Sequence, residues 1–188
     1  MVLASTLSTQ GWWITSRAAG IAALVLASAS VGIGLLIGGR LVRGHGPDLR
    51  ATHEALSLAA LVALVVHVAT LLGDTYFHAS IADLTIPFVR NYRGPYMAIG
   101  IIGGWGMLAL GLSYYVRERI GINRWKVLHR FTALAWILGI VHSLGIGTDS
   151  GRTWFIAMVA IATGPPLLLL IVRMARGHGR NAAATTTA

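Results

Sequence analysis

One stretch of the chain constrains the fold more than any other, an apolar run from Asp48 to Gly73 that carries His53 and His67. At about 1.5 Å per residue, a helix of this length crosses a bilayer whose hydrocarbon core is about 30 Å thick. Imidazole rings do not enter hydrocarbon without a partner. The run therefore predicts a membrane-spanning helix whose histidines hold or contact another polar group.

A second long apolar run, beginning at Asn123, carries His129 and His142. We predict that Asp48 and Asn123 are the N-caps of the two helices. Counted from these caps, the first histidine of each helix lies about 8 Å along the axis and the second about 28 Å. Parallel helices would therefore form two pairs, each able to clamp one iron porphyrin from both faces. The predicted pairs are His53 with His129 and His67 with His142.

The two helices differ in the angle between their histidines. At about 100° per residue, His67 lies within roughly 40° of His53, whereas His142 lies roughly 140° from His129. The second helix must therefore bend, contain a bulge or present its ligands from different flanks. We expect Gly139 to tolerate such a distortion.

The composition indicates a membrane protein. Of the 188 residues, 55% are hydrophobic and only 11% are charged, which excludes a soluble domain of ordinary composition. Further apolar runs at 18–39, 96–116 and 154–174 bring the number of spans to five. Cysteine is absent, which excludes disulfides, thiolate ligands and covalent c-type haem. We predict an all-α integral membrane protein, a five-helix transmembrane bundle with two b haems between the second and fourth spans.

The net charge of +9 falls in short loops rather than on one face, so it indicates topology and not nucleic-acid binding. Loops one and three and the C-terminal segment hold eleven basic residues, against four on the other side. The positive-inside rule then puts the N-terminus outside the cell membrane and the C-terminus in the cytoplasm. We expect an extracytoplasmic segment at 1–13, a haem-binding transmembrane domain at 14–174 and a disordered cytoplasmic tail at 175–188. One lysine against fourteen arginines suggests a bacterial source.

Several basic residues lie near the predicted pairs and suit the propionates of a porphyrin, because guanidinium forks match carboxylates. Arg93 is the strongest candidate. The alternative for each of these residues is that it only helps to orient the helices in the membrane. The candidates are Arg50 and Lys126 near the cytoplasmic-side pair, and Arg90, Arg93 and Arg152 near the outer pair.

Trp136 follows His129 by seven positions and lies near mid-membrane, so it either sits between the two macrocycles or packs in the core. The remaining histidines, His45, His78 and His178, fall in loops or in the tail and are expected to be solvated.

The histidine spacings, His-x13-His in the second span and His-x12-His in the fourth, resemble those of the ferric reductase-like transmembrane domain family. This family includes the membrane cores of ferric-chelate reductases and NADPH oxidases. The stretches SRAAG, NYRGPY and HSLGIGTDS resemble those of its short bacterial members. The resemblance covers about residues 12–174 and implies that the four histidines are axial ligands of two b haems. No dinucleotide-binding motif follows the fifth span, so the electron donor is expected to be a separate molecule.

These features predict a transmembrane di-haem b cytochrome that passes electrons from a cytoplasmic-side donor to an extracytoplasmic acceptor. The donor would be a flavoprotein reductase or a membrane quinol, and the acceptor ferric iron, oxygen or a periplasmic redox protein. Within this class, the alternatives are a haem subunit feeding a periplasmic reductase, such as methionine-sulfoxide reductase, and a quinol-dependent cytochrome b. A non-redox transporter or scaffold is the alternative of another class.

Overall fold

The protein is described by a computed structural model that covers residues 2–39, 41, 46–90 and 92–186. These residues form helices and connecting turns without strands. Five helical stretches are long and apolar enough to cross a membrane, which confirms the predicted class of an all-helical, multi-pass membrane protein. They are Gln10–Gly39, Pro47–Leu71, Gly94–Ile120, Ile122–Ile146 and Thr153–Arg176.

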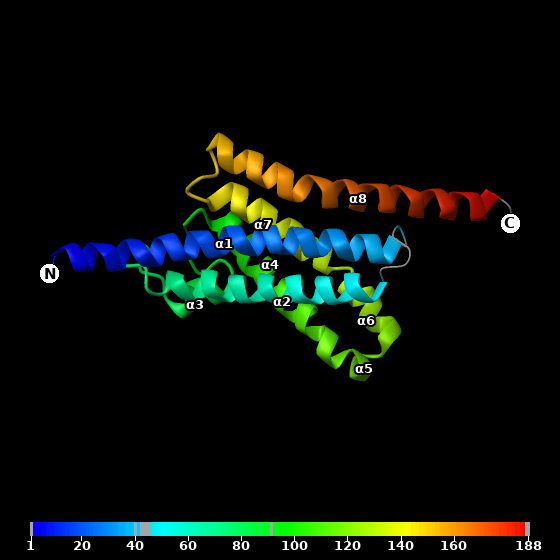
Figure 1. Cartoon of the computed structure of the whole chain (residues 1–188), viewed down its shortest axis with the longest axis horizontal. Coiled ribbons are helices and arrows are strands. Elements are labelled where there is room, and N and C mark those ends of the chain that lie inside the picture. The colour runs from blue at the N-terminus through cyan, green and yellow to red at the C-terminus, as the bar shows by residue number, and fades with distance from the viewer. Residues whose placement is uncertain (1, 40, 42–45, 91, 187–188) are drawn as a thin grey trace.

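The spans are built from the helices labelled in Figure 1, of which α1 and α8 are the longest. The third and fourth spans each consist of more than one helix. In chain order the helices are α1 (Val2–Gly39), α2 (Gly46–Leu71), α3 (Ile81–Thr85), α4 (Gly94–Leu112), η1 (Ser113–Val116), α5 (Arg117–Ile120), α6 (Ile122–His129), α7 (Thr132–Ile146) and α8 (Thr153–Thr186).

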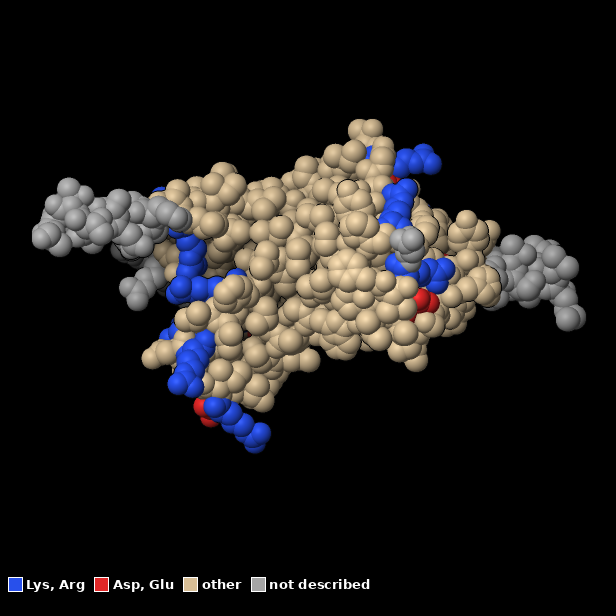
Figure 2. Space-filling model, turned by 180° about the vertical axis from the view of Figure 1, so that it is seen from behind, with Lys and Arg blue, Asp and Glu red and all other residues tan. Residues whose placement is uncertain are grey.

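The helices associate as two antiparallel pairs. α1 packs most extensively against α2, and α4 against α7, while α8 lies along α1 (Figure 1). The Lys and Arg residues gather at the two ends of the bundle and leave a broad uncharged band between them on the face shown in Figure 2. We call these the Arg17 end and the Arg119 end, after one arginine at each.

The two spans that carry the histidines do not begin at the predicted capping residues. Asp48 lies in the first turn of α2, which begins at Gly46, and Asn123 is the second residue of α6. The N-cap of α6 is Gly121, which has a φ of 91°. Pro47 and Gly121 explain the difference, because proline suits the first helical turn and glycine alone adopts positive φ without strain.

The fourth span is interrupted directly after His129. α6 ends at this residue and α7 begins at Thr132, with i to i+3 hydrogen bonds from Arg130 to Val127 (3.2 Å) and from Phe131 to Leu128 (3.0 Å). Such 3₁₀-type turns rotate the chain by about 20° more per residue than an α-helix does. The distortion that the spacing predicted is therefore present, but it lies at Arg130 and Phe131 rather than at Gly139.

Polar contacts tie the connections together at the Arg17 end. Ser80 and Asp83 form a capping box at α3, and the hydrogen bonds from Ser80 lower the pKa of Asp83 below its usual value. Arg17 forms an ion pair with the buried Asp149, and its guanidinium lies over the rings of Trp13 and Trp154. At Arg17, α1 is thereby joined to the turn between α7 and α8.

Both described chain ends are helical. α1 begins at Val2 and so includes the expected N-terminal segment, and α8 runs through Pro165 and Pro166 and on to Thr186. The last part of α8 lies in the segment for which a disordered tail was predicted. Its alanines have the highest intrinsic helix propensity of any residue.

The core is centred on Trp136, whose side chain is 1% exposed. Its indole Nε1–H donates to the Ser28 hydroxyl across 2.9 Å, and that hydroxyl donates to the Leu24 carbonyl of the same helix. Around them pack residues of α1, α2, α7 and α8, namely Leu24, Ala27, Ala60, Ile140, Phe155 and Val159. Trp136 therefore connects α7 to α1.

We predict that Trp136→Ala lowers the free energy of unfolding in detergent by about 3–5 kcal/mol, because it leaves a large cavity. Trp136→Phe should cost less, about 1 kcal/mol, since mainly one interhelical hydrogen bond is lost. Leu134→Ala on the same helix is the control, because Leu134 is 53% exposed and faces away from the core. An equal loss for Leu134→Ala and Trp136→Ala, measured by denaturant titration, would contradict this assignment of the core.

Candidate functional site

The four histidines of the spans come together in two places. His53 in α2 faces His129 at the end of α6, with ring centroids 6.1 Å apart and ring planes at 88°. His67, near the other end of α2, and His142 in α7 influence each other electrostatically, but their rings make no direct contact of the kind that His53 and His129 make. The first pair lies toward the Arg119 end and the second toward the Arg17 end. The structure thus brings together the same residues that the sequence grouped by depth.

Three of these histidines share one contact, a hydrogen bond between ring Nδ1 and a backbone carbonyl of the adjacent helix. A carbonyl can only accept, so Nδ1 carries the proton and Nε2 keeps a free lone pair. This is the arrangement by which proteins orient a histidine that binds a metal through Nε2. The partners are Ser16 O for His67 (2.8 Å), Ser30 O for His53 (2.9 Å) and Tyr96 O for His142 (2.9 Å).

A glycine lies one turn after each of these carbonyls, where the imidazole ring packs on the backbone. A Cβ at Gly20 would lie 2.9 Å from Nδ1 of His67, and a Cβ at Gly34 would lie 3.0 Å from Cε1 of His53. A Cβ at Gly100 would overlap the ring of His142. The hydrogen bonds therefore depend on a close approach that a larger residue would obstruct.

His129 differs from the other three. The Leu110 carbonyl is near its ring, yet the buried Nδ1 has no hydrogen bond of normal geometry within the part of the chain that the structure describes. The Leu110 carbonyl instead accepts the Ser113 hydroxyl at 2.6 Å. The ring of His129 stacks on Trp125, with centroids 5.0 Å apart, and Trp125 donates to the same Ser113 hydroxyl at 3.1 Å. Stacking therefore orients His129 where hydrogen bonding orients the others.

Sequence reasoning missed Trp125 and the two serines, although each had a signal. Trp125 precedes His129 by four positions and so lies on the same helix face. Ser16 and Ser30 are fourteen residues apart, as are Gly20 and Gly34 and as are the two histidines of α2. Two antiparallel helices with equal spacings place each serine opposite one histidine.

The predicted basic residues lie at the ends of the bundle. Arg93 donates to the Gly145 carbonyl at 2.8 Å, three residues after His142. Arg50 and Lys126 are exposed at the Arg119 end, and neither has an ion pair or hydrogen bond with another described residue. Arg90 contacts the Phe77 carbonyl (2.6 Å) and Asp83, and it therefore stabilises the connection before α4.

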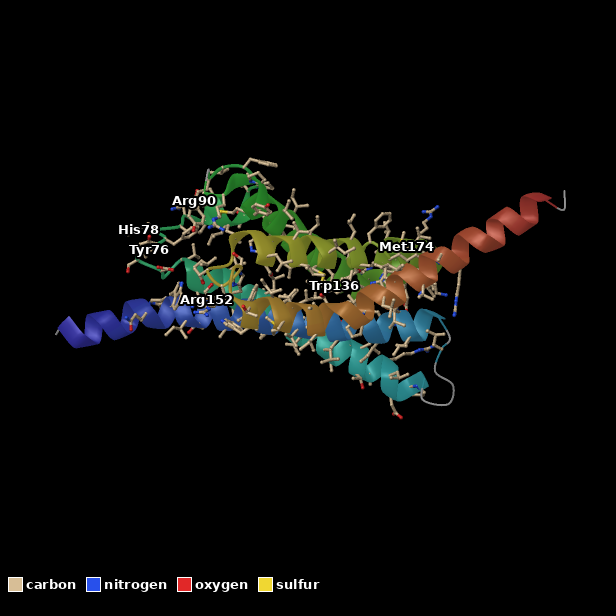
Figure 3. The ribbon with its side chains drawn as sticks, turned by 90° about the horizontal axis from the view of Figure 1, so that it is seen from above. Tyr76, His78, Arg90, Trp136, Arg152 and Met174 are labelled. Carbon is tan, nitrogen blue, oxygen red and sulfur yellow. The ribbon has the colours of Figure 1, made fainter. Side chains whose placement is uncertain are left out.

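Figure 3 shows His78, Arg90 and Arg152 at one end of the bundle and Trp136 within it. Trp136 is buried on α7 between the levels of the two histidine pairs. His78 is exposed and His45 lies outside the described residues. The side chain of His178 is also outside the described part.

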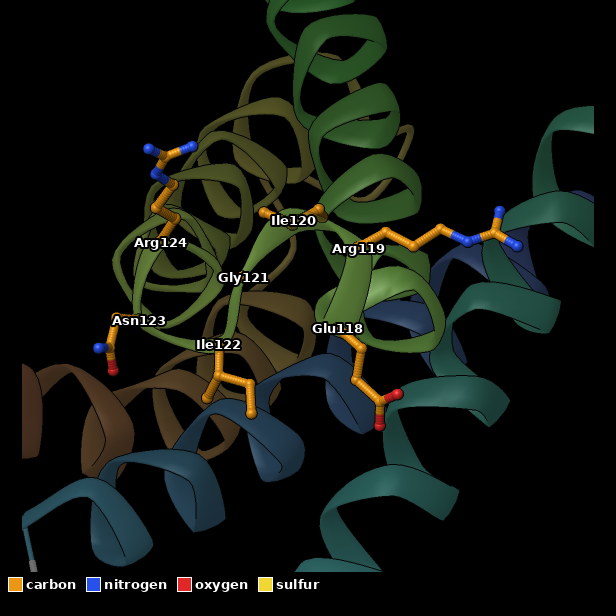
Figure 4. A pocket seen from close by; sticks show the side chains of 7 residues that line it. All are labelled: Glu118, Arg119, Ile120, Gly121, Ile122, Asn123 and Arg124. Atoms are coloured by element: carbon orange, nitrogen blue, oxygen red, sulfur yellow. The ribbon is translucent and has the colours of Figure 1, made fainter.

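An open hollow of about 560 Å³ lies at the Arg119 end, lined by residues 118–124. Figure 4 shows Arg119 and Arg124 extending from its two sides. Among the described residues, no cluster of three or more His, Cys, Asp or Glu is placed to hold a metal ion by protein ligands alone. Each histidine pair therefore offers two imidazole rings.

Comparison with known proteins supplies an independent finding. The family model described as ferric reductase like transmembrane component matches residues 19–140. The matched segment includes His53, His67 and His129 and ends two residues before His142. No solved structure matches the chain. Because the match spans more than half of the 188 residues, the chain belongs to the ferric reductase-like transmembrane component family.

Proposed function

We propose that this protein is a transmembrane di-haem b cytochrome that carries electrons from a cytoplasmic-side donor to an extracytoplasmic acceptor. The observation that carries the proposal is the pair of His53 and His129, facing each other at 6.1 Å near one end of the bundle. His67 and His142 are close enough to influence each other electrostatically near the other end of the bundle, although they form no ring contact of the kind that His53 and His129 make. Membership of the family supports a membrane redox role.

The chain's residues fit a porphyrin iron held by two imidazoles. Metal–imidazole bonds are about 2 Å long, so two bonds and two half-rings span about 6 Å, close to the centroid separation of His53 and His129. A bound haem b would supply reversible one-electron chemistry, and His53 with His129 would hold one such group and His67 with His142 the other. The backbone carbonyls would hold the Nδ1 protons and raise the basicity of the coordinating nitrogens.

Other residues take supporting roles in this proposal. The guanidinium of Arg93 lies beside the turn that follows His142, and Arg50 and Lys126 lie near the other pair, where cations suit propionates. Trp136 excludes water between the two levels and offers an aromatic ring there. The charge bias makes the Arg119 end cytoplasmic, so His53 and His129 form the inner pair and His67 and His142 the outer pair.

The pairing predicts which haem each histidine variant loses. Purified protein should bind two haems b per chain by pyridine haemochrome assay. His67→Ala and His142→Ala should remove one redox transition, and His53→Ala and His129→Ala the other, because each iron needs both ligands. His78→Ala is the control, since His78 is exposed in a loop. Loss of the same transition in His67→Ala and His129→Ala would contradict the pairing.

The close contact at Gly100 predicts a selective loss as well. Gly100→Ala should displace the ring of His142 and reduce the content of the outer haem, while the inner haem is retained. Gly139→Ala on α7 is the matched control, because a Cβ there meets nothing within 4 Å. An equal loss of haem in both variants, measured by redox titration, would show that general helix packing and not the ring contact is responsible.

The exposed arginines at the hollow predict the class of donor. An acidic flavoprotein would be attracted to Arg119 and Arg124, close to the helix that ends at His129. If the donor is such a separate flavoprotein, the haems of the protein in detergent should not be reduced by NADPH alone. They should be reduced when a flavin reductase is added. The rate should fall as salt increases, because the Debye length is about 10 Å at 0.1 M.

Arg119→Ala and Arg124→Ala should slow this reduction in stopped-flow absorbance measurements. Glu118→Ala is the control, because Glu118 lines the same hollow but its loss removes a negative charge and should not slow the reduction. Rapid reduction by a menaquinol analogue, without salt dependence and without a flavoprotein, would instead assign quinol as the donor.

A further inference from the structure

We infer that Ser16 and Ser30 are matched positioning residues, each hydroxyl clamping one histidine of α2. The inference deepens the proposed function, because these histidines are the proposed haem ligands. It concerns the serine side chains, as distinct from the backbone carbonyls described above.

Ser16 holds His67 at two points. Its hydroxyl oxygen lies 3.2 Å from Nδ1 of His67, and the same hydroxyl donates to the His67 backbone carbonyl at 3.0 Å. The Ser16 backbone carbonyl accepts the Nδ1 proton at 2.8 Å. Both the ring and the backbone of His67 are therefore fixed to one residue of α1.

Ser30 makes the corresponding contacts with His53. Its hydroxyl oxygen lies 3.0 Å from Nδ1 and 3.4 Å from the His53 carbonyl oxygen. A second hydroxyl, from Ser57, lies 2.7 Å from the Ser30 hydroxyl and donates to the His53 carbonyl at 2.7 Å. At the outer clamp the Thr70 hydroxyl lies 3.1 Å from the His67 carbonyl oxygen, so both histidine carbonyls meet a second hydroxyl, but only Ser57 also contacts the serine of α1.

The direction of these hydroxyl bonds separates the two serines from others in the bundle. A serine or threonine in a helix usually donates to the carbonyl four residues earlier in its own helix, as Ser28, Ser143 and Thr163 do here. Ser16 and Ser30 instead reach across to α2, although both are buried, at 4% and 5% exposure. Their hydroxyls are therefore committed to the histidines.

The clamp is confined to α2. His142 has the carbonyl of Tyr96 and the close contact with Gly100, and its ring has no hydroxyl partner among the described residues. Each proposed haem would therefore have one clamped histidine, from α2, and one that is held less firmly, from α6 or α7. Removing a serine hydroxyl should alter the clamped ligand of one haem and leave the other haem unchanged.

Ser16→Ala and Ser30→Ala test the inference in the purified holoprotein by redox titration and by EPR of the oxidised form. Because the carbonyl contact remains, both haems should stay bound. Ser16→Ala should shift the midpoint potential and the g-values of the haem that His67→Ala removes, and Ser30→Ala those of the other. Faster haem dissociation, by about tenfold, should accompany each shift, at the lower end of what the loss of an outer-shell partner usually causes because the carbonyl contact remains.

Ser143→Ala is the matched control, since Ser143 adjoins His142 but donates to Gly139 of its own helix. If Ser16→Ala and Ser30→Ala match this control in potential and g-values, the serines only join two helices and the inference is wrong. A shift of both haems, or of the other haem, overturns it equally. If the alanine variants do not fold, Ser16→Thr and Ser30→Thr keep the hydroxyl, whereas Ser16→Val and Ser30→Val have a similar shape without it. Only the valine variants should show the shift.

A readout without haem separates this inference from the proposed function. ¹⁵N NMR of the histidine side chains, recorded on the reduced protein or on protein found to lack haem, reports the hydrogen bonding of Nδ1. Ser16→Ala should change the Nδ1 signal of His67 alone, and Ser30→Ala that of His53. A wild-type protein without haem refutes the proposed function, whereas unchanged signals in both variants refute the serine clamp.

Discussion

The hydrogen bond between an imidazole Nδ1–H and a backbone carbonyl of the neighbouring helix is the interaction on which this bundle depends. A helical carbonyl already accepts a bond within its own helix, but its second lone pair remains available. A histidine ring can reach that lone pair only if the two helices approach closely, which requires a small residue one turn away. Gly20, Gly34 and Gly100 meet this requirement. The packing of α1 on α2 and of α4 on α7 thus follows from the need to satisfy imidazoles in hydrocarbon.

The two helix pairs solve this problem unequally. On α1, the serine and glycine contacts recur after fourteen residues, so both histidines of α2 are held in the same manner. On α4, the regular helix ends at Leu112, two residues after the carbonyl that lies nearest His129, and η1 follows. The Leu110 carbonyl is occupied by Ser113, and Trp125 stacks on His129 instead. The break in the fourth span at Arg130 and Phe131 accompanies this irregularity, because a ring without a carbonyl partner need not keep the helical phase of His142.

The sequence predicted the features that depend on depth and hydropathy, namely the spans and the histidine pairs. It did not predict the features that depend on backbone hydrogen bonds, namely the Nδ1 partners and the position of the helix break. Hydropathy located the five spans, and counting along two helices grouped His53 with His129, because rise per residue is nearly constant. The sequence does not indicate the Nδ1 partners, because every residue has a backbone carbonyl and no side chain shows which carbonyl accepts the Nδ1 proton. The helix distortion was assigned to Gly139 because glycine tolerates it, whereas the observed break follows local hydrogen bonding. The residue type of Asn123 predicts a cap, but the N-cap of α6 is Gly121, which has the positive φ.

The spacing of the histidines also bears on why a chain of this kind would carry two sites rather than one. Fourteen residues of helix between His53 and His67 rise about 21 Å, which leaves only about 5 Å on either side of a hydrocarbon core about 30 Å thick. A single site at the middle would lie about 15 Å from both surfaces. With two sites, each proposed haem lies near one end of the bundle, and the buried Trp136 fills the level between them. The positions of the carbonyl and serine contacts on α1 are therefore set by the thickness of the membrane that the electrons would have to cross.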